Sequence, residues 1–287
     1  MTRIVYVNGR YLRYRAAQVH AEDRGFQLAD AVYEVIEVRG GQLVDETRHL
    51  ARLSRSLGEL GIREPMSRRA LGLVLRQTML RNRIENGLVY LQVTRGAAPR
   101  DFLFPSPPVR PTVVCLARRL DPARLEARAA AGIAVKTMPD FRWARSDIKT
   151  VMLLPACLAK EAARAAGADE AWFVDRQGFV TEGASSNAWI LDARDRLVTH
   201  PRETTILAGV ARATVIDVLA EAGVDLIERP FRVAEALAAR EAFITSASAT
   251  VMPVVKIDGT AIGDGRPGRV TQLLRSRFHQ VAEISSR

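Results

Sequence analysis

Residues 147–155 read Asp-Ile-Lys-Thr-Val-Met-Leu-Leu-Pro, a stretch that places Lys149 directly before a run of apolar side chains. Lysine is rare here, because only four of the 42 Lys and Arg residues are lysines: Lys136, Lys149, Lys160 and Lys256. An amine can lose its proton and attack a carbonyl, whereas a guanidinium cannot. Burial in apolar surroundings lowers the pKa of an amine, which is the condition for a Schiff-base lysine. Local sequence alone favours the simpler interpretation, a lysine with a buried stem whose head reaches water or pairs with Asp147.

The length and composition are those of a globular protein. The 287 residues are 48% hydrophobic and 26% charged, enough for a large core, and the length favours two domains. No apolar stretch approaches the ~20 residues of a membrane span, and the first residues lack an apolar signal core. We therefore expect a cytoplasmic protein with no membrane partner. Cys115 and Cys157 stand in apolar settings without ligand-spaced neighbours, so we expect reduced core residues and no metal site.

The net charge of +10 is compatible with a nucleic-acid partner. Nucleic-acid binding requires one basic face, however, whereas these arginines are dispersed and aromatic residues make up only 6% of the chain. We therefore expect no nucleic-acid partner. A non-catalytic basic binding protein remains the alternative from outside the enzymes.

Hydrophobic periodicity predicts a mixed order of strands and helices with many hairpins, one of them around Asn8-Gly9. This order indicates an α+β fold rather than a doubly wound parallel sheet. The stretch 97–111 contains five prolines and is predicted to be a loop. The predicted strands are 3–7, 10–14, 31–39, 88–95, 111–117, 132–137, 171–174, 178–181, 188–191, 196–199, 224–229, 241–246 and 251–257. The predicted helices are 47–60, 67–83, 155–166, 209–222 and one from about 267.

The charged, Ala-rich residues 119–128 lack a clear apolar face, and we expect them to connect the two domains. A smaller N-terminal α+β domain would then span residues 1–118, and a larger C-terminal domain residues 129–287.

Three segments after Lys149 carry small and polar residues. Residues 181–187 (Thr-Glu-Gly-Ala-Ser-Ser-Asn) follow a predicted strand, residues 206–212 (Ile-Leu-Ala-Gly-Val-Ala-Arg) open a predicted helix, and residues 245–250 (Thr-Ser-Ala-Ser-Ala-Thr) form a turn. Such clusters are common in turns, and free N–H groups at a helix start bind phosphate. Each segment taken alone is weak evidence of a site.

In order along the chain, these segments resemble the class IV (fold type IV) aminotransferases, most closely the D-amino-acid branch. The resemblance covers essentially the whole chain and includes Glu22-Asp23-Arg24-Gly25, Asp30-Ala31-Val32-Tyr33-Glu34-Val35, Thr94-Arg95-Gly96, Pro99-Arg100 and Asp147-Ile148-Lys149. It implies a pyridoxal 5′-phosphate cofactor between two domains, with the C-terminal domain binding the cofactor. It also implies a homodimer with sites at the subunit interface.

The resemblance implies a role for each matching residue. Lys149 would form the Schiff base and move the proton between Cα and C4′, while Glu182 would keep the pyridine nitrogen protonated. Arg52 would pair with the phosphate, and Ala211 offers only its N–H where the family often has a hydroxyl. The other residues implied in cofactor binding are Ser186, Asn187, Leu207, Gly209, Val210, Ser246, Ala247 and Ser248.

In that branch the substrate carboxylate is held by a Tyr, an Arg and a His, the last two from a partner subunit. Tyr33 and Arg100 match, but Phe102 stands where the His is usual. A Phe cannot donate to a carboxylate, so we expect the substrate carboxylate to lose a hydrogen bond worth roughly 1.5–3 kcal/mol. We also expect some tolerance of amines without a carboxylate. Asp101 adds a negative charge there unless Arg95 or another cation neutralises it.

The resemblance thus implies two-stage transamination between a D-alanine-like amino acid and a 2-oxo acid, either 2-oxoglutarate or pyruvate. Three alternatives share the fold: an L-branched-chain aminotransferase, an (R)-amine:pyruvate aminotransferase and an aminodeoxychorismate lyase. Arg100 argues against the first and Phe102 keeps the second open. The lyase remains open because a fold does not determine a reaction.

Overall fold

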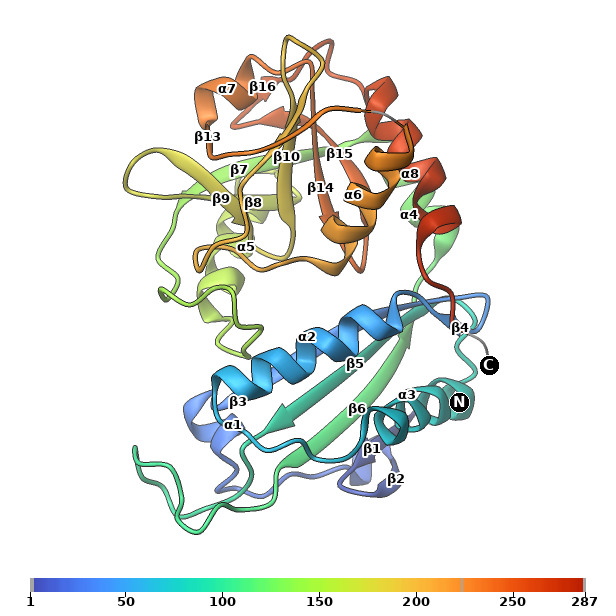
Figure 1. Cartoon of the computed structure of the whole chain (residues 1–287), viewed down its shortest axis with the longest axis vertical. Helices are drawn as coiled ribbons and strands as arrows, with labels where there is room; N and C mark the ends of the chain where they lie inside the picture. The colour runs from blue at the N-terminus through green and yellow to red at the C-terminus, as the bar shows by residue number, and fades with distance from the viewer. Residues whose placement is uncertain (1–2, 223, 286–287) are drawn as a thin grey trace. The chain divides into compact units, whose positions relative to one another are not determined.

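The computed structural model describes residues 3–222 and 224–285, and the chain divides into two compact units. The first unit comprises Met1–Asp121, Ile148–Met152 and Glu283–Arg287, and the second comprises Pro122–Asp147 and Leu153–Ala282. Each unit combines one β-sheet with helices (Figure 1). The predicted α+β class is therefore confirmed.

The first unit contains a six-stranded antiparallel sheet in the order β2-β1-β6-β5-β3-β4. Two of its pairings are equally long, β3 with β5, from Ala31 opposite Thr94 to Val38 opposite Gly87, and β5 with β6. The strands are β1 (Ile4–Val7), β2 (Arg10–Arg13), β3 (Ala31–Arg39), β4 (Gln42–Leu43), β5 (Gly87–Thr94) and β6 (Thr112–Arg119).

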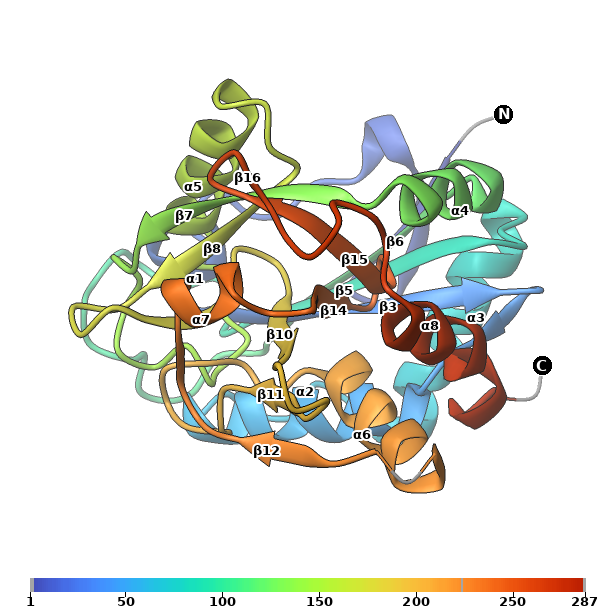
Figure 2. The same cartoon turned by 90° about the horizontal axis from the view of Figure 1, so that it is seen from above.

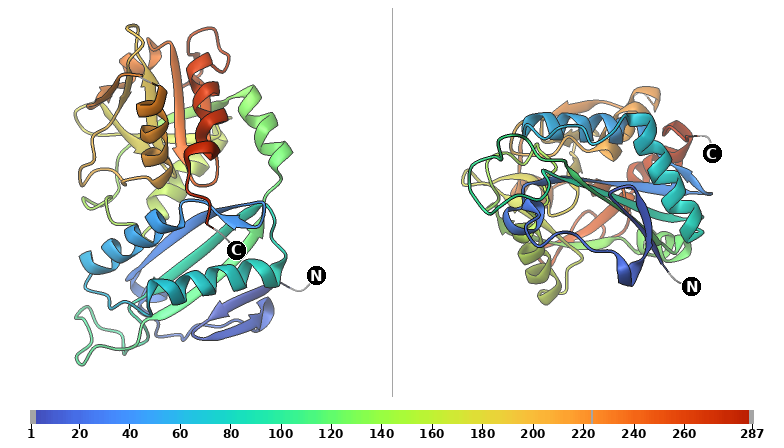
Figure 3. Two further views of the ribbon diagram at one scale, coloured as in Figure 1. Left: turned by 45° about the vertical axis from the view of Figure 1, so that its right-hand side comes forward. Right: turned by 90° about the horizontal axis from the view of Figure 1, so that it is seen from below.

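Two helices, α2 (Glu46–Glu59) and α3 (Arg68–Asn82), cover one face of this sheet (Figures 1 and 3). Because side chains alternate along a strand, Val32, Glu34 and Ile36 of β3 are buried on the helix side, whereas Tyr33 and Val35 are half-buried on the other. The sheet therefore has a packed face and a more open one. The remaining elements of this unit are short: η1 (Tyr14–Ala16) and α1 (Arg24–Leu28).

The second unit contains a ten-stranded mixed sheet in the order β12-β11-β10-β14-β15-β7-β8-β9-β13, with β16 paired to β15. Parallel pairs occur between β7 and β8, β7 and β15, and β11 and β12. The strands are β7 (Ile133–Pro139), β8 (Glu170–Val174), β9 (Phe179–Gly183), β10 (Asn187–Leu191), β11 (Leu197–Thr199), β12 (Leu226–Glu228), β13 (Phe231–Arg232), β14 (Glu241–Ser246), β15 (Thr250–Ile257) and β16 (Thr260–Ala261).

Helices pack on this sheet in two groups. Helix α5 (Leu154–Ala165) lies against β7 and β8, while α6 (Val210–Ala222) and α8 (Arg269–Val281) pack on each other and on β14 and β15 (Figure 2). Helix α7 (Val233–Leu237) follows β13 directly. Cys157 is exposed on α5, contrary to the prediction that it is a core residue, because α5 buries the face that carries Ala159 and Ala163; Cys115 is buried as predicted.

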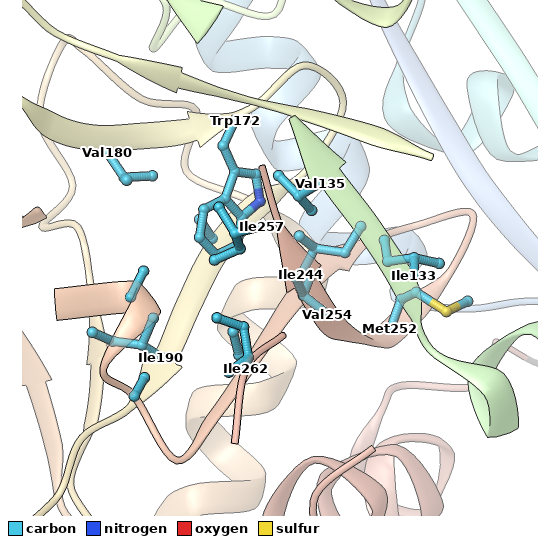
Figure 4. Close-up of a cluster of buried hydrophobic side chains, with 14 of the residues drawn as sticks. Ile133, Val135, Trp172, Val180, Ile190, Ile244, Met252, Val254, Ile257 and Ile262 are labelled. Atoms are coloured by element: carbon cyan, nitrogen blue, oxygen red, sulfur yellow. The ribbon is translucent and has the colours of Figure 1, made fainter. Parts of the chain in front are cut away.

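The core of the second unit is enclosed by its own strands. Side chains from eight strands form one buried cluster, which includes Trp172, Val135, Ile190, Ile244 and Val254 (Figure 4). The Trp172 indole Nε1 has no hydrogen-bond partner among the described residues, so this interior is purely apolar at that point. A rigid apolar core of this kind fixes the strand ends on which polar side chains sit.

Most predicted elements are confirmed, but α4 (Pro122–Ala131) is a correction, because it is a helix that begins within the predicted connection 119–128. Its strong helix formers and early proline outweigh the lack of an apolar face. The division into domains 1–118 and 129–287 remains a prediction. No helix in 3–222 or 224–285 is both long and apolar enough to cross a membrane.

Candidate active site

The peptide that carries Lys149 extends the edge of β3 in the first unit. Tyr33 N donates to Lys149 O at 3.0 Å, and Val151 N donates to Ala31 O at 3.1 Å. Lys149 N also donates to Ser56 Oγ of α2 at 3.4 Å. The backbone of Lys149 is therefore held on two sides, and its Nζ lies 4.3 Å from the centroid of the Tyr33 ring.

Two sequence expectations about Lys149 are corrected. The apolar run after it is not buried in this chain, since Met152 is 42% and Leu154 69% exposed. Asp147 binds Arg145 (2.9 and 3.1 Å). Lys149 Nζ instead faces the Tyr33 ring, an amphipathic surface that accepts either a cation or a neutral amine.

Arg52, the predicted phosphate ligand, is held by Glu34 in the first unit. Its Nε and Nη2 each donate at 2.8 Å to a different oxygen of the Glu34 carboxylate. His49 Nδ1 lies 2.7 Å from Glu34 Oε2, and it carries the proton because a carboxylate only accepts. The guanidinium of Arg52 thus has one fixed orientation, which suits a rigid anion such as phosphate.

The ionisation states of this cluster follow from its charges. Burial alone would raise the pKa of Glu34, but Arg52 and His49 lower that pKa to about 2. Burial lowers the pKa of His49, and the charges of Arg52 and Lys149 add to this effect against the raising effect of Glu34. Near neutral pH the cluster is therefore an ionised acid, a neutral imidazole and a guanidinium. Sequence reasoning missed Glu34 and His49 as site residues.

In the second unit, both oxygens of the buried Glu182 carboxylate are hydrogen-bonded. Arg142 Nη1 donates to Oε1, while Asn187 Nδ2 and the backbone N–H of Leu207 donate to Oε2 at 3.1 Å each. Asn187 Nδ2 also donates to Leu207 O at 2.9 Å. The structure therefore brings together three residues that the resemblance implied, two from the segment 181–187 and one from the segment 206–212.

Arg142, which sequence reasoning missed, organises the surroundings of Glu182. It donates to both oxygens of Asp140 (3.0 and 2.7 Å) and to Thr181 Oγ1 (3.2 Å), and it lies 4.6 Å from the centroid of the Phe173 ring. Burial opposes the charge of Arg142, but Asp140 and Glu182 raise its pKa above the ordinary value. Burial likewise opposes ionisation of Asp140, yet its bonds to Arg142 lower its pKa.

The start of α6 lies next to this carboxylate. Helix α6 begins at Val210, so the N–H groups of Val210 and Ala211 have no partner within the helix. A Cβ on Gly209 would lie 2.0 Å from Asn187 Oδ1, so only glycine fits before this helix. Asn187 also pairs with Thr245 across β10 and β14, which brings residues 246–248 to the same end of the sheet.

The hydroxyls in this region are partly engaged elsewhere. Ser186 Oγ donates to Glu170 Oε2 at 3.2 Å, and Ser185 Oγ does so at 3.0 Å. Ser246 Oγ and Ser248 Oγ lie 3.3 Å apart in the turn between β14 and β15. Ser186 therefore supports the loop through its hydrogen bond to Glu170.

Arg100 and Phe102 lie at the exposed tip of the loop 97–111. Phe102 is 81% exposed, and the Arg100 guanidinium carbon lies 5.7 Å from its ring centroid. Arg24 anchors the loop by donating to the carbonyl oxygens of Asp101 (2.7 Å) and Leu103 (3.2 Å). Among the described residues of this one chain, no contact links Arg100 or Phe102 to Tyr33 or Lys149.

Comparison with known proteins identifies the family. A family model described as Amino-transferase class IV matches residues 31–257. The chain belongs to the class IV aminotransferases. A D-alanine aminotransferase from Staphylococcus haemolyticus is 38% identical over 98% of this chain and 99% of the relative. One from Bacillus licheniformis is also 38% identical, over 93% of each chain.

Solved structures match the fold of this aminotransferase. The branched-chain amino acid aminotransferase of Escherichia coli has a TM-score of 0.89 at 22% identity, covering 98% of this chain and 95% of its own. A hypothetical aminotransferase from Mycobacterium tuberculosis, solved in its PLP-bound form, has a TM-score of 0.84 at 21% identity, covering 97% and 98%. At this identity the likeness shows the fold alone, and it confirms the fold type.

As a class IV aminotransferase, the protein is a transaminase that depends on pyridoxal 5′-phosphate. The residues present fit this cofactor. The first unit offers an amine at Lys149 and a fixed guanidinium at Arg52, and the second offers a held carboxylate at Glu182. The second unit also has the N–H groups that open α6, behind a glycine where a Cβ would clash. Among the described residues, no cluster of three His, Cys, Asp or Glu could hold a metal ion.

Proposed function

We propose that this aminotransferase transfers the amino group of D-alanine or a similar D-amino acid to a 2-oxo acid, such as 2-oxoglutarate or pyruvate, in a two-stage exchange. The observation that carries this proposal is the likeness to D-alanine aminotransferases at 36–38% identity over nearly their whole length. The first-unit amine and the second-unit carboxylate support the chemistry.

When bound, pyridoxal 5′-phosphate supplies an aldehyde that takes up the amino group and a ring that accepts electrons. Lys149 Nζ would hold the cofactor, and it would move the proton from the substrate Cα to C4′ in the first stage and in the opposite direction in the second. The bonds from its peptide to β3 and to Ser56 fix the direction of approach, so one face of the substrate is deprotonated.

Glu182 holds a proton on the ring nitrogen, which requires an ionised and fixed carboxylate. Arg142, Asn187 and Leu207 together occupy both of its oxygens. Arg52, Val210 and Ala211 bind the phosphate, with Ser246, Ala247, Ser248 and Gly209 completing the cradle. Ser186 contributes by holding the loop through Glu170.

Tyr33 and the Arg100 of a partner subunit bind the substrate carboxylate, so the working form is a homodimer with sites at the subunit interface. The exposure of the loop tip that carries Phe102 supports such a contact. A cytoplasmic location is proposed with it, since both cysteines are free thiols.

A second candidate activity is (R)-amine:pyruvate transamination. Phe102 favours it, because an apolar side chain in place of a donor suits an amine without a carboxylate.

The test is a panel of half-reactions. Yellow holoenzyme is mixed separately with D-alanine, L-leucine, L-glutamate and (R)-1-phenylethylamine, and the loss of its yellow absorbance is timed. D-alanine should react fastest; faster reaction with L-leucine would reject the stereochemical assignment, and faster reaction with the amine would favour the second candidate. Borohydride should bleach the wild type and a Lys256→Ala control, whereas Lys149→Ala should never hold the bleachable colour.

A further inference from the structure

The open face of the first sheet carries a glutamine opposite Tyr33, the residue whose ring faces the amine of Lys149. Gln92 of β5 pairs with Tyr33 of β3, so their side chains lie on the same face with Cβ atoms about 5 Å apart. Lys149 Nζ lies 4.3 Å from the centroid of that Tyr33 ring. Gln92 is thus a direct neighbour of the residue proposed to hold the carboxylate, and all three residues belong to one unit.

Tyr90 sets the orientation of the Gln92 amide. Its hydroxyl donates to Gln92 Oε1 at 2.6 Å, and its ring stacks on Tyr33 with centroids 5.5 Å apart. Burial, with a smaller effect of Tyr33, raises the pKa of Tyr90 to about 12, so the hydroxyl keeps its proton. Because Oε1 accepts the hydrogen bond from Tyr90, the part of the Gln92 amide that remains for a ligand is Nε2, with its two N–H donors.

The Nε2 group of Gln92 has no hydrogen-bond partner in the parts of the chain that the structure describes, 3–222 and 224–285. A carboxylate is purely an acceptor, so a pair of oriented N–H donors beside Tyr33 is complementary to it. The position also matters because Phe102 cannot donate from the place where the family usually has a histidine.

We propose that Gln92 Nε2 donates a hydrogen bond to the α-carboxylate of the substrate and supplies the donor that Phe102 lacks. Tyr90 acts as a positioning residue that turns the amide nitrogen toward the substrate. The inference rests on the proposed function and deepens it: the substrate class is α-amino acids and 2-oxo acids, and amines without a carboxylate gain nothing from Gln92.

Two substitutions with matched controls test the inference. Gln92→Leu removes the amide at similar size, and Tyr90→Phe removes only the hydroxyl. Gln42→Leu on β4 and Tyr11→Phe on β2 are the controls, since both are half-buried in the same sheet. Each holoenzyme is titrated with propanoate by calorimetry, which measures carboxylate binding without turnover. Steady-state kinetics with D-alanine and (R)-1-phenylethylamine, and pyridoxal phosphate binding to each apoprotein, complete the set.

Gln92→Leu should weaken propanoate binding and raise the KM for D-alanine by about ten- to hundred-fold, as expected for a bond to a charged group. Tyr90→Phe should change both in the same direction by a few-fold. Neither should alter the KM for the amine or the affinity for pyridoxal phosphate. Unchanged propanoate binding in Gln92→Leu, or equal losses for both substrates, would overturn the inference.

Failure of the proposed function has a different signature. A wild type that binds no pyridoxal phosphate, or that ignores D-alanine, would reject that function, whereas selective loss of propanoate binding would still support Gln92 as a carboxylate ligand. If Gln92→Leu does not fold, Tyr90→Phe decides: a few-fold, carboxylate-selective loss supports the inference and no loss rejects it.

Discussion

Glu34 in the first unit and Glu182 in the second are both buried carboxylates bound by an arginine, but their surroundings differ. Glu34 lies in the middle of β3, and its partners Arg52 and His49 both come from α2. Glu182 lies near the end of β9 and is bound by Arg142, by Asn187 and by the backbone N–H of Leu207. One cluster joins a helix to a strand, whereas the other gathers loop segments at a sheet end.

The comparison shows two opposite uses of the same ion pair. In the first unit the acid is the support, because Glu34 fixes the guanidinium of Arg52, the residue proposed to bind the cofactor phosphate. In the second unit the arginine is the support, because Arg142 fixes the carboxylate of Glu182, the residue proposed to face the cofactor nitrogen. Damage to the first pair should therefore reduce cofactor binding and stability, and damage to the second should reduce turnover.

The largest expected effect is that of Glu182→Gln, which keeps the shape of the side chain and removes its charge. A neutral amide cannot hold the proton on the ring nitrogen, so kcat with D-alanine should fall by roughly 10²–10³-fold. Steady-state kinetics measure this loss, with Glu34→Gln as the matched control that should keep most of kcat. Comparable kcat losses in the two variants would abolish the contrast between the clusters.

The second prediction concerns acid stability. The pKa of Glu34 is lowered from 4.5 to about 2 in the folded protein, so its stabilisation is complete above pH 4.5 and is lost as the pH falls toward 2. The loss is about 3 kcal/mol, since each pKa unit corresponds to ~1.4 kcal/mol. Urea unfolding of the apoprotein across this pH range measures it.

Protonation of His49 also reduces the stability of the fold as the pH falls, and it does so at higher pH than protonation of Glu34. Its pKa is lowered from 6.5 on folding, so the unfolded chain binds the proton first and stability declines below pH 6.5. Glu34→Gln should flatten the pH dependence below pH 4.5. An unchanged slope in that variant would show that Glu34 is not the group responsible.

Arg142→Met should have the next largest effect. It removes one charge-assisted hydrogen bond to Glu182, worth about 2 kcal/mol, so kcat should fall about thirty-fold. Without the guanidinium the carboxylate binds a proton more readily, and the loss should grow as the pH falls. Arg142→Lys should recover part of the activity. A loss confined to KM, with a flat pH profile, would argue that Arg142 has only a structural role.

The smallest expected effect is that of Phe102→His, a substitution outside both clusters. Phe102→His restores the donor that the family usually has, at a side chain that is 81% exposed, so stability should not change. The KM for D-alanine should fall by about three-fold in the wild type and by more in Gln92→Leu, where the carboxylate lacks a second donor. Equal gains in both backgrounds would mean that Phe102 and Gln92 act on different parts of the substrate.

The sequence predicted the elements and the reactive groups that stand in characteristic local patterns. The α+β class, the helix that starts near Val210 and the strand that leads to Glu182 are local features, and the structure contains each of them. Lys149, Asn187 and Leu207 were found through the order of their motifs. The contact of Leu207 with Glu182 was not predicted, because it joins segments 25 residues apart, and that of Asn187 was not predicted because it depends on how the chain turns between β9 and β10.

The supporting residues could not be predicted for a related reason. Glu34 interrupts an alternating apolar strand, and only packing against α2 shows that His49 and Arg52 compensate its charge. Arg142 is one of many arginines, and nothing local distinguishes it from those on the surface. Gln92 is an ordinary polar strand residue until strand pairing places it opposite Tyr33. The prediction that the apolar run after Lys149 is buried was wrong, because composition does not determine whether another part of the chain packs against that run.

Five residues, Ile148–Met152, belong to the first unit although the chain on both sides of them belongs to the second. Those residues form an isolated bridge with β3 at Thr150 and Val32, and they present Lys149 to Tyr33. A protein cut between Asp121 and Pro122 would therefore give one fragment with the acceptor edge and another with the reactive peptide. Neither piece should hold a correctly placed amine, but mixing the two should restore it by strand complementation.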